Sequence, residues 1–355
     1  MKKVLILTGS YGSGHNRAAR VLEKQLIAEG NQVLILDIVD FLNENSMKSG
    51  NITKSFYEDF CEKYKKVWEI TFNIIDDATV KRFLYGIKYP IFQSRFDDFV
   101  QTYEPDVVLS VFPFWQGFIK HYLKKYEKTF KTGVFITDSI NIHSIWYLDK
   151  DYIDYYFVID KLTKGEFIEK FNHTKDNIIV SFFPLESDFF LDREEIKVKN
   201  IILLLTSQEE NFILDLLEIL KTRKEFNINI LAGRNKVLFS YVSQFYTDID
   251  NFKFYPFFDI KSELKNIDLV ISKPGGAIIS ECIANDVPVI IPTFIAGQEE
   301  GNKLLVELGE VGFFEPDAKK IDFALRYLDF SKFIPNFRKI KNKDSTKIII
   351  DTLMN

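Results

Sequence analysis

The sequence has 355 residues, 46% of them hydrophobic and 27% charged, a length sufficient for two domains. Its net charge of −5 argues against a nucleic-acid-binding protein that gains affinity by neutralising phosphates. Neither cysteine stands in a metal-ligand spacing, which fits a reducing compartment. The N-terminal apolar stretch is too short for a signal peptide, and no apolar run reaches ~18 residues. We therefore expect a cytoplasmic protein that at most associates with a membrane face.

Short apolar, β-branched runs alternate with longer helical patterns, as is typical of βαβ units and parallel sheets. The predicted strands of the first half are Lys3–Thr8, Gln32–Ile38, Asp106–Val111, Thr132–Thr137 and Tyr155–Ile159. Those of the second half are Asn200–Leu205, Asn227–Leu231, Leu269–Ile271 and Val287–Ile291. These two series predict an α/β protein with two Rossmann-like domains, residues 1–190 and 191–340. A linker is expected near Phe182–Lys199, and a final helix within 341–355 is expected to pack back across the domain junction.

Residues 53–100 interrupt this alternation with apolar side chains at helical spacing. The favoured interpretation is a set of helices that packs on the N-terminal sheet. The alternative is that this insert exposes some of its aromatic side chains to a lipid interface, among them Trp68, Tyr85, Tyr89 and Phe92. Its charges are balanced, so it lacks the polybasic signature of a lipid-binding segment.

A glycine-rich turn follows the first strand and leads into a helix from about His15 to Glu29. Gly12 and Gly14 allow a sharp turn and bring backbone N–H groups close to a ligand at the helix N-terminus. His15 is then directed into a cleft, where an imidazole is a candidate general base. The spacing alone leaves open a histidine that only caps the helix.

A second polar segment, Thr137–Trp146, follows another predicted strand of the first half. Asp138, His143 and Trp146 are expected to face the interdomain cleft from this position.

The turn Ser272–Gly276 follows the strand Leu269–Ile271 and opens a helix. The free N–H groups and positive dipole of that helix end predict a diphosphate site at Gly275 and Gly276. Glu281 lies about a turn into the helix, where its carboxylate can accept both hydroxyls of a ribose. A tight strand-to-helix turn with a solvated glutamate is the alternative.

Polar side chains also follow the next strand, in the run Pro292–Asn302. Gln298, Glu299 and Asn302 can hydrogen-bond several sugar hydroxyls. A solvated helix start is the default for such a run. Because both turns follow adjacent parallel strands, their carboxyl ends meet at one edge, and we favour a functional site.

Taken together, these motifs resemble the monogalactosyl/diglucosyl-diacylglycerol synthase branch of glycosyltransferase family 28. The strongest stretch is Ile271–Asn302, and Gly12–His15 and Thr137–Trp146 resemble the N-terminal motifs of that branch. Two further segments correspond to the family's donor side, namely the turn Gly233, Arg234 and Asn235, and Phe258 before the helix that positions the nucleotide base.

The resemblance implies a GT-B fold, in which two Rossmann-like domains face each other across a cleft. It implies an inverting transfer of glucose or galactose from a UDP-sugar to a diacylglycerol-type lipid at the inner face of the cell membrane. It makes His15 the acceptor base, with Gly275, Gly276 and Ala277 at the diphosphate and Glu281 at the ribose. No cofactor or metal is expected.

Several departures from the family pattern concern the acceptor side and the hinge. Phe112 stands where the family usually has a histidine, and Ser144 stands where a proline is usual. The glycine-rich turn after the first C-terminal strand is replaced by Leu205–Gln208, and the interdomain motif is Ser181–Pro184. The acceptor is therefore less strongly indicated than the donor.

Three other functions remain open from the sequence. They are an N-acetylglucosaminyltransferase for a polyprenyl-linked peptidoglycan precursor, a sugar-nucleotide 2-epimerase, and a non-catalytic membrane-associated protein. Two Asp-x-Asp pairs, Asp149/Asp151 and Asp248/Asp250, have the spacing of metal-dependent transferases. Neither pair follows a convincing active-site strand.

Overall fold

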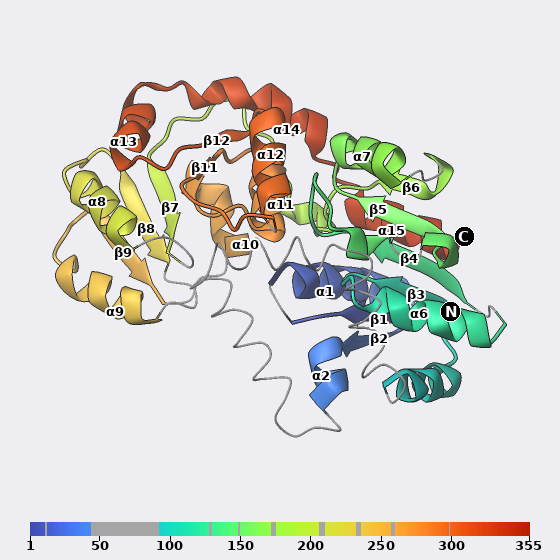
Figure 1. Ribbon diagram of the computed structural model, residues 1–355. Helices are drawn as coiled ribbons and strands as arrows, with labels where there is room; N and C mark the ends of the chain where they lie inside the picture. The colour runs from blue at the N-terminus through green and yellow to red at the C-terminus, as the bar shows by residue number, and fades with distance from the viewer. Residues whose placement is uncertain are drawn as a thin grey trace. The chain divides into compact units, whose positions relative to one another are not determined.

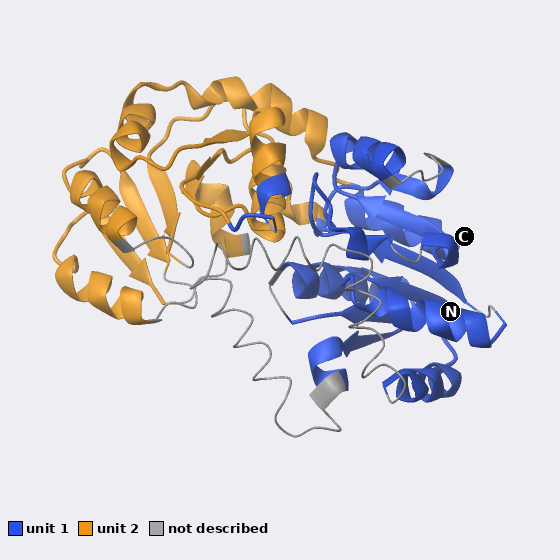
Figure 2. Ribbon diagram, viewed as in Figure 1, with its two compact units in different colours: residues 1–186, 295–301, 344–355 blue, residues 187–294, 302–343 orange. Residues whose placement is uncertain are grey.

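A computed structural model describes residues 1–10, 13–43, 92–127, 130–147, 150–171, 175–205, 210–231, 236–256, 260–297 and 299–355. The chain divides into two compact units (Figure 2). Unit 1 comprises residues 1–186, 295–301 and 344–355, and unit 2 comprises residues 187–294 and 302–343. Each unit is built around one parallel sheet.

The sheet of unit 1 has six strands in the order β2-β1-β3-β4-β5-β6 (Figure 1). The strands are β1 Lys3–Thr8, β2 Gln32–Asp37, β3 Val107–Ser110, β4 Lys131–Phe135, β5 Tyr155–Val158 and β6 Ile178–Val180. Its helices are α1 Ser13–Ala28, α2 Ile38–Asn43, α6 Trp115–Lys125, α7 Lys161–Phe171 and α15 Ser345–Met354, with residues 92–103 also helical. Every strand pair is parallel. The helices that connect such strands cover the sheet faces, and this explains why β3 is buried throughout.

The sheet of unit 2 has six strands in the order β12-β11-β10-β7-β8-β9. The strands are β7 Asn200–Leu204, β8 Asn227–Leu231, β9 Phe252–Tyr255, β10 Leu269–Ile271, β11 Val289–Ile291 and β12 Gly312–Phe314. The helices are α8 Glu210–Leu220, α9 Lys236–Phe245, α10 Ile260–Glu263, α11 Gly276–Ala284, α12 Glu300–Leu308, α13 Ala318–Tyr327 and α14 Ile334–Ile340. These strands also pair in parallel. The predicted α/β class with two parallel sheets is confirmed.

The core of unit 1 is unusually aromatic, as the 35 phenylalanines of the chain suggest. Phe41, Phe96 and Trp115 are each at most 2% exposed, and their ring centroids lie 5.3 to 6.5 Å apart. Phe92 packs against the same cluster, with its centroid 6.4 Å from that of Phe41. For Phe92 the structure therefore supports core packing over lipid contact. Trp68, Tyr85 and Tyr89 lie outside the described residues.

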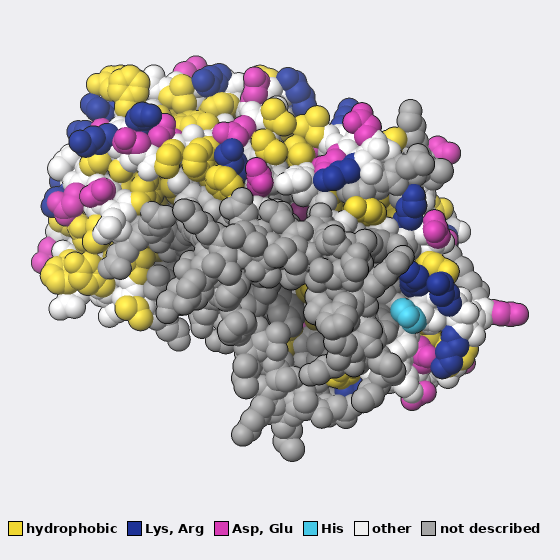
Figure 3. Space-filling view, viewed as in Figure 1, with side chains coloured by type: hydrophobic (Ala, Val, Ile, Leu, Met, Phe, Trp, Pro, Cys, Tyr) yellow, Lys and Arg dark blue, Asp and Glu magenta, His cyan; other side chains and the backbone are white. Residues whose placement is uncertain are grey.

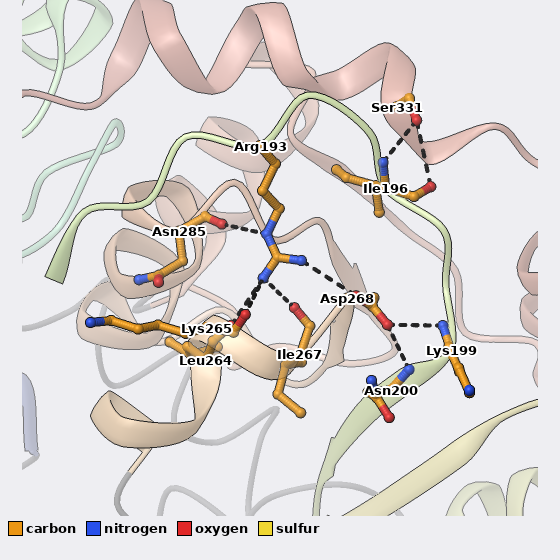
Figure 4. Close-up of polar contacts among 10 residues, drawn as sticks. All are labelled: Arg193, Ile196, Lys199, Asn200, Leu264, Lys265, Ile267, Asp268, Asn285 and Ser331. Carbon is orange, nitrogen blue, oxygen red and sulfur yellow. Dashed lines mark hydrogen bonds and ion pairs between the residues drawn. The ribbon is translucent and has the colours of Figure 1, made fainter.

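The segment that leads from β6 to β7 is fixed onto unit 2 by Arg193 (Figure 4). Its guanidinium donates to the carbonyl oxygens of Ile267 at 2.7 Å and Leu264 at 3.1 Å, and it pairs with Asp268 at 3.3 Å. Because the Arg193 guanidinium bonds carbonyl groups and a carboxylate at once, it links this segment to the loop that leads into the strand Leu269–Ile271. This part of the expected linker thus belongs to the folded body of unit 2.

Exposed apolar side chains gather on two helices of unit 2, α9 and α13 (left part of Figure 3). On α9 they recur at every fourth position, as Val237, Tyr241 and Phe245. On α13 they are Phe323 and Tyr327.

Candidate active site

His15 lies in the first turn of α1, at the edge of the sheet where β1, β3 and β4 end. Its Nδ1 lies 2.7 Å from the carbonyl oxygen of Val111 and 3.2 Å from Oγ1 of Thr137. A carbonyl oxygen can only accept, so Nδ1 carries the proton and donates. The lone pair is therefore on Nε2, as a base requires.

Aromatic rings enclose the His15 imidazole. The centroid of the Phe112 ring lies 5.0 Å away in an edge-to-face contact, and that of Trp146 lies 6.3 Å away. Burial lowers the pKa of His15 from 6.5 to about 4, against the opposing effects of the Val111 hydrogen bond and the Asp37 carboxylate. The imidazole is consequently neutral at pH 7 and available to take a proton.

Side chains of β2 and α1 hold the turn after β1 by hydrogen bonds. Asp37, at the end of β2, accepts hydrogen bonds from the backbone N–H and hydroxyl of Ser10. Asn16 donates to Oγ of Ser10 at 2.7 Å and accepts from the hydroxyl of Thr8 at 2.9 Å. A Cβ on Gly9 would lie only 2.7 Å from the Phe112 ring, so this position has no room for a side chain. The turn, helix α1 and strand β2 are thus joined by one hydrogen-bond network next to His15.

Gly12 and Gly14 are the two glycines predicted to allow this turn. Gly14 lies in the first turn of α1 and is partly buried. Gly12 lies outside the described residues.

The segment after β4 brings its predicted residues to the same edge. Trp146 is buried beside His15. His143 caps the short helix Ser144–Trp146, with its Nδ1 accepting from the backbone N–H of Ile145 at 3.2 Å. Asp138 is partly buried, in the loop between Thr137 and this helix. His143 therefore has a structural role as the N-cap of this short helix.

Backbone strain is concentrated in this loop. Ile140 and Asn141 have φ values of 43° and 50°, in the left-handed region that side chains with a Cβ rarely adopt. Thr163 and Glu166, on α7, accept hydrogen bonds from their backbone N–H groups. Strained backbone of this kind is retained where the surrounding structure enforces it, commonly at functional sites.

The run after β11 reaches this strained loop within unit 1. A Cβ on Gly301 would lie 1.8 Å from the carbonyl oxygen of Ile140 and 2.0 Å from that of Ser139. Only a glycine allows so close an approach of two backbones. Within unit 1, Gly301 of the predicted sugar-reading run is therefore a neighbour of the predicted acceptor-side loop.

The predicted diphosphate site is the N-terminus of α11. Gly275 is the N-cap, with φ −67° and ψ 141°, and it makes no side-chain capping bond. The first helical residues are Gly276 and Ala277, both partly buried. N–H groups at such a helix start, together with the positive dipole end, favour a bound anion.

Three predicted donor-side residues with carboxylate or amide side chains are buried. Glu281 is 8% exposed on α11 and Asn302 is 2% exposed on α12. Glu299 is 4% exposed, and its carboxylate accepts the N–H of Ile295 at 2.9 Å. This bond closes the turn that precedes α12. Gly233, Arg234, Asn235, Phe258 and Gln298 lie outside the described residues.

The Asp-x-Asp pairs do not lie at the carboxyl ends of strands. Asp248 and Asp250 precede β9, and Asp151 precedes β5, so these carboxylates stand at the opposite ends of the strands. Asp149 lies outside the described residues. Over the described ranges, His, Cys, Asp and Glu side chains form no group of three or more that could hold a metal ion.

The helices in the described part of the chain are all too short or too polar to cross a membrane.

Comparison with protein families assigns most of the chain. Residues 15–203 match the model of monogalactosyldiacylglycerol (MGDG) synthase. This protein belongs to the MGDG synthase family. Residues 207–309 match the glycosyltransferase family 28 C-terminal domain. The predicted family is thereby confirmed, and the protein is a glycosyltransferase.

Curated relatives extend the similarity over most of the chain. A processive diacylglycerol beta-glucosyltransferase of Bacillus pumilus is 26% identical over 314 residues, which cover 85% of this chain and 80% of the relative. The protein of the same name from Bacillus subtilis is 24% identical over 317 residues, with the same coverage.

Solved structures confirm the GT-B fold. MurG of Acinetobacter baumannii superposes with a TM-score of 0.65 at 14% identity and covers 99% of both chains. A UDP-GlcNAc 2-epimerase from Neisseria meningitidis reaches 0.60 at 14% identity, again over 99% of both chains. The spinosyn rhamnosyltransferase SpnG also matches, with a TM-score of 0.61 at 11% identity over the whole of both chains. Because a transferase and an epimerase share this fold, the fold does not decide the reaction.

Proposed function

We propose that this protein transfers glucose from UDP-glucose to the free hydroxyl of a diacylglycerol-type lipid, with inversion at the anomeric carbon. The observation that carries the proposal is the hydrogen bond between Nδ1 of His15 and the Val111 carbonyl, which leaves Nε2 to act as a base. The names of the curated relatives support glucose over galactose and a diacylglycerol acceptor. The acceptor stays in a bilayer, so the protein would act at the inner face of the cell membrane.

The reaction is a single displacement. Nε2 of His15 takes the proton of the lipid hydroxyl while the bond between sugar and phosphate breaks. The UDP leaving group gains negative charge, which the N-terminus of α11 at Gly275 stabilises. Glu281 holds the ribose in this scheme, and Gln298, Glu299 and Asn302 contact the sugar. The helix terminus replaces a metal ion, so transfer is expected to persist in excess EDTA.

The test is an assay with liposomes of diacylglycerol and either UDP-glucose or UDP-galactose, with products resolved by mass and anomeric configuration by NMR. We expect a β-glucosyl lipid and little galactosyl lipid. His15→Gln should lower kcat at least ~10²-fold. The matched control is His121→Gln, which replaces an exposed histidine on α6. Equal rates for the two variants would exclude His15 as the base.

Two further arms separate the rival reactions. UDP-GlcNAc alone reports epimerisation, and UDP-GlcNAc with a polyprenyl-linked precursor reports the peptidoglycan reaction. Glu281→Ala should weaken UDP binding by ~1–3 kcal/mol in calorimetry. Turnover in either rival arm, without glycolipid in the first, would replace the proposed function.

A further inference from the structure

Gln116, the second residue of α6, is buried without hydrogen bonds. Its side chain is 1% exposed, and neither Nε2 nor Oε1 has a partner in the described structure. Most buried polar side chains in proteins are paired, because each unpaired group retains its desolvation penalty. Trp115, Phe118 and Ile119, its neighbours along α6, are buried apolar residues of the core of unit 1.

The first turn of α6 lies beside His15. The indole Nε1 of Trp115 donates to the carbonyl oxygen of Thr8 at 2.7 Å, which fixes this turn against the end of β1. Val111, whose carbonyl holds His15, belongs to the connection between β3 and α6. Cα–Cβ bonds in a helix tilt toward its N-terminus, so the Cα–Cβ bond of Gln116 leans toward the sheet edge that carries His15.

The start of α6 is itself weakly bonded. Its N-cap, Phe114, makes no side-chain capping bond. The N–H groups of Trp115 and Gln116 lie 3.5 and 3.4 Å from the carbonyl oxygens of Phe112 and Pro113, at the long limit for hydrogen bonds. An oxygen that only accepts hydrogen bonds fits this helix end. The positive end of the helix dipole and the side-chain amide N–H groups of Gln116 both favour such an oxygen.

We propose that Gln116 and the first turn of α6 bind an ester carbonyl oxygen of the acceptor lipid; this rests on the proposed function. The amide Nε2 donates to the carbonyl of the ester next to the free hydroxyl. The hydroxyl is then placed toward Nε2 of His15. Three rotatable bonds let the Gln116 amide turn from its packed position to the ligand. The site selects glycerol lipids with ester linkages over those with ether linkages.

The test combines two proteins with two acceptors. Wild type and Gln116→Leu are assayed with dioctanoylglycerol and with its dioctyl ether analogue, which lacks the carbonyl groups. Wild type should prefer the ester by about tenfold in kcat/KM, the effect of one lost hydrogen bond. Gln116→Leu should show no preference. Gln101→Leu, an exposed glutamine replaced in the same way, should behave as wild type.

Melting temperatures provide a second readout that needs no turnover. Gln116→Leu should melt at or above the wild-type temperature, because it removes an unpaired buried amide. Dioctanoylglycerol should raise the melting temperature of wild type more than the ether does, and the variant should lose that difference. A preference for the ester that persists in Gln116→Leu, or a variant that melts several degrees lower, would overturn the proposal. Selective stabilisation without glycolipid would support the carbonyl site and reject the proposed reaction.

Discussion

The two groups that control the His15 imidazole come from consecutive residues after β3. The carbonyl oxygen of Val111 fixes the proton on Nδ1, and the ring of Phe112 packs edge-on against the imidazole. Ser110 braces this turn, since its hydroxyl donates to the Phe112 carbonyl at 2.7 Å. One short connection therefore fixes the tautomer of the imidazole and shields the ring from water.

The pH dependence of transfer should report the Phe112 contact. With the pKa of His15 lowered to about 4, kcat/KM of wild type should fall only as the pH approaches 4. Phe112→Ala admits water to the imidazole, so the acid limb should move up toward pH 6.5. Phe114→Ala removes a ring that is 45% exposed and serves as the control. The measurement is the position of the acid limb, and an unchanged limb in Phe112→Ala would assign the low pKa to other groups.

The same pKa links stability to pH. Between pH 6.5 and 4 the unfolded chain binds the His15 proton and the folded protein does not, so unfolding becomes easier as the pH falls. This difference in proton binding contributes at most about 3 kcal/mol to the free energy of unfolding. The contribution is fully present above pH 6.5 and is lost as the pH falls to 4. Urea unfolding at pH 7.5 and 5 should therefore show a smaller loss for His15→Gln than for wild type. His121→Gln retains His15 and should lose as much as wild type.

Sequence reasoning could identify His15 but not its surroundings. The glycine-rich turn after a strand is a local signal, and it placed the imidazole at a helix start. Val111 lies 96 positions away and Thr137 lies 122 positions away, and parallel sheet order brings them together. Phe112 was noted only for the histidine it replaces, because a sequence cannot show which ring a phenylalanine will contact.

At the scale of elements, α11 shows why a motif made of a strand, a turn and a helix can be placed from the sequence. Strand, turn and helix are contiguous, so β10, Gly275 and Glu281 are positioned by local backbone geometry. The φ of Gly275 is ordinary, and a Cβ there would meet nothing nearer than Ile278 at 3.6 Å. Among the described residues, neither conformation nor packing requires glycine at that position, whereas the proposed approach of a diphosphate would account for it.

Gly275→Ala should consequently separate binding from folding. We expect the melting temperature to stay within about a degree or two of wild type, since the added methyl group makes only ordinary contacts. UDP affinity should fall about tenfold or more, because the methyl group keeps the diphosphate from the N–H groups of α11. Gly165→Ala on α7, where a Cβ would meet nothing within 4 Å among the described residues, is the control for the affinity measurement. Unchanged affinity in calorimetry would place the diphosphate elsewhere.

Three strands were not predicted, namely β6, β9 and β12. Each lies at or near a sheet edge and is at most four residues long. β6 ends at Val180, two residues before the start of the expected linker at Phe182. β12 contains Gly312, and glycine is disfavoured in strands. Here a Cβ would lie 2.0 Å from the carbonyl oxygen of Val289, so pairing with β11 is the reason for the glycine.

At the scale of the whole molecule, unit 1 is assembled from three separate pieces of the chain. Its last piece, α15, packs against α1 and β4. Thr346 donates to the carbonyl oxygen of Leu185 at 2.8 Å, and Leu353 fills the space left by the missing side chain of Gly133. The helix is thus part of the core of unit 1 although it follows unit 2 in sequence.

Substitutions in α15 should destabilise unit 1. Leu353 is 3% exposed, and Leu353→Ala should lower the free energy of unfolding by about 2–4 kcal/mol through loss of burial and a new cavity. Lys347→Ala, on the exposed face of the same helix, should have little effect. Hydrogen exchange should show faster exchange in β4 and α1 of Leu353→Ala, with unit 2 unchanged. Equal protection in both variants would mean that α15 is peripheral to the core.

The position of α15 has a consequence for biosynthesis. Domains of a nascent chain commonly fold in order from the N-terminus. Unit 1 departs from that order, because residues 344–355 leave the ribosome only after all of unit 2 has been translated. Until then the surface around Gly133 lacks Leu353 and stays open to chaperones or to other nascent chains. Unit 1, whose sheet is synthesised first, is therefore completed last.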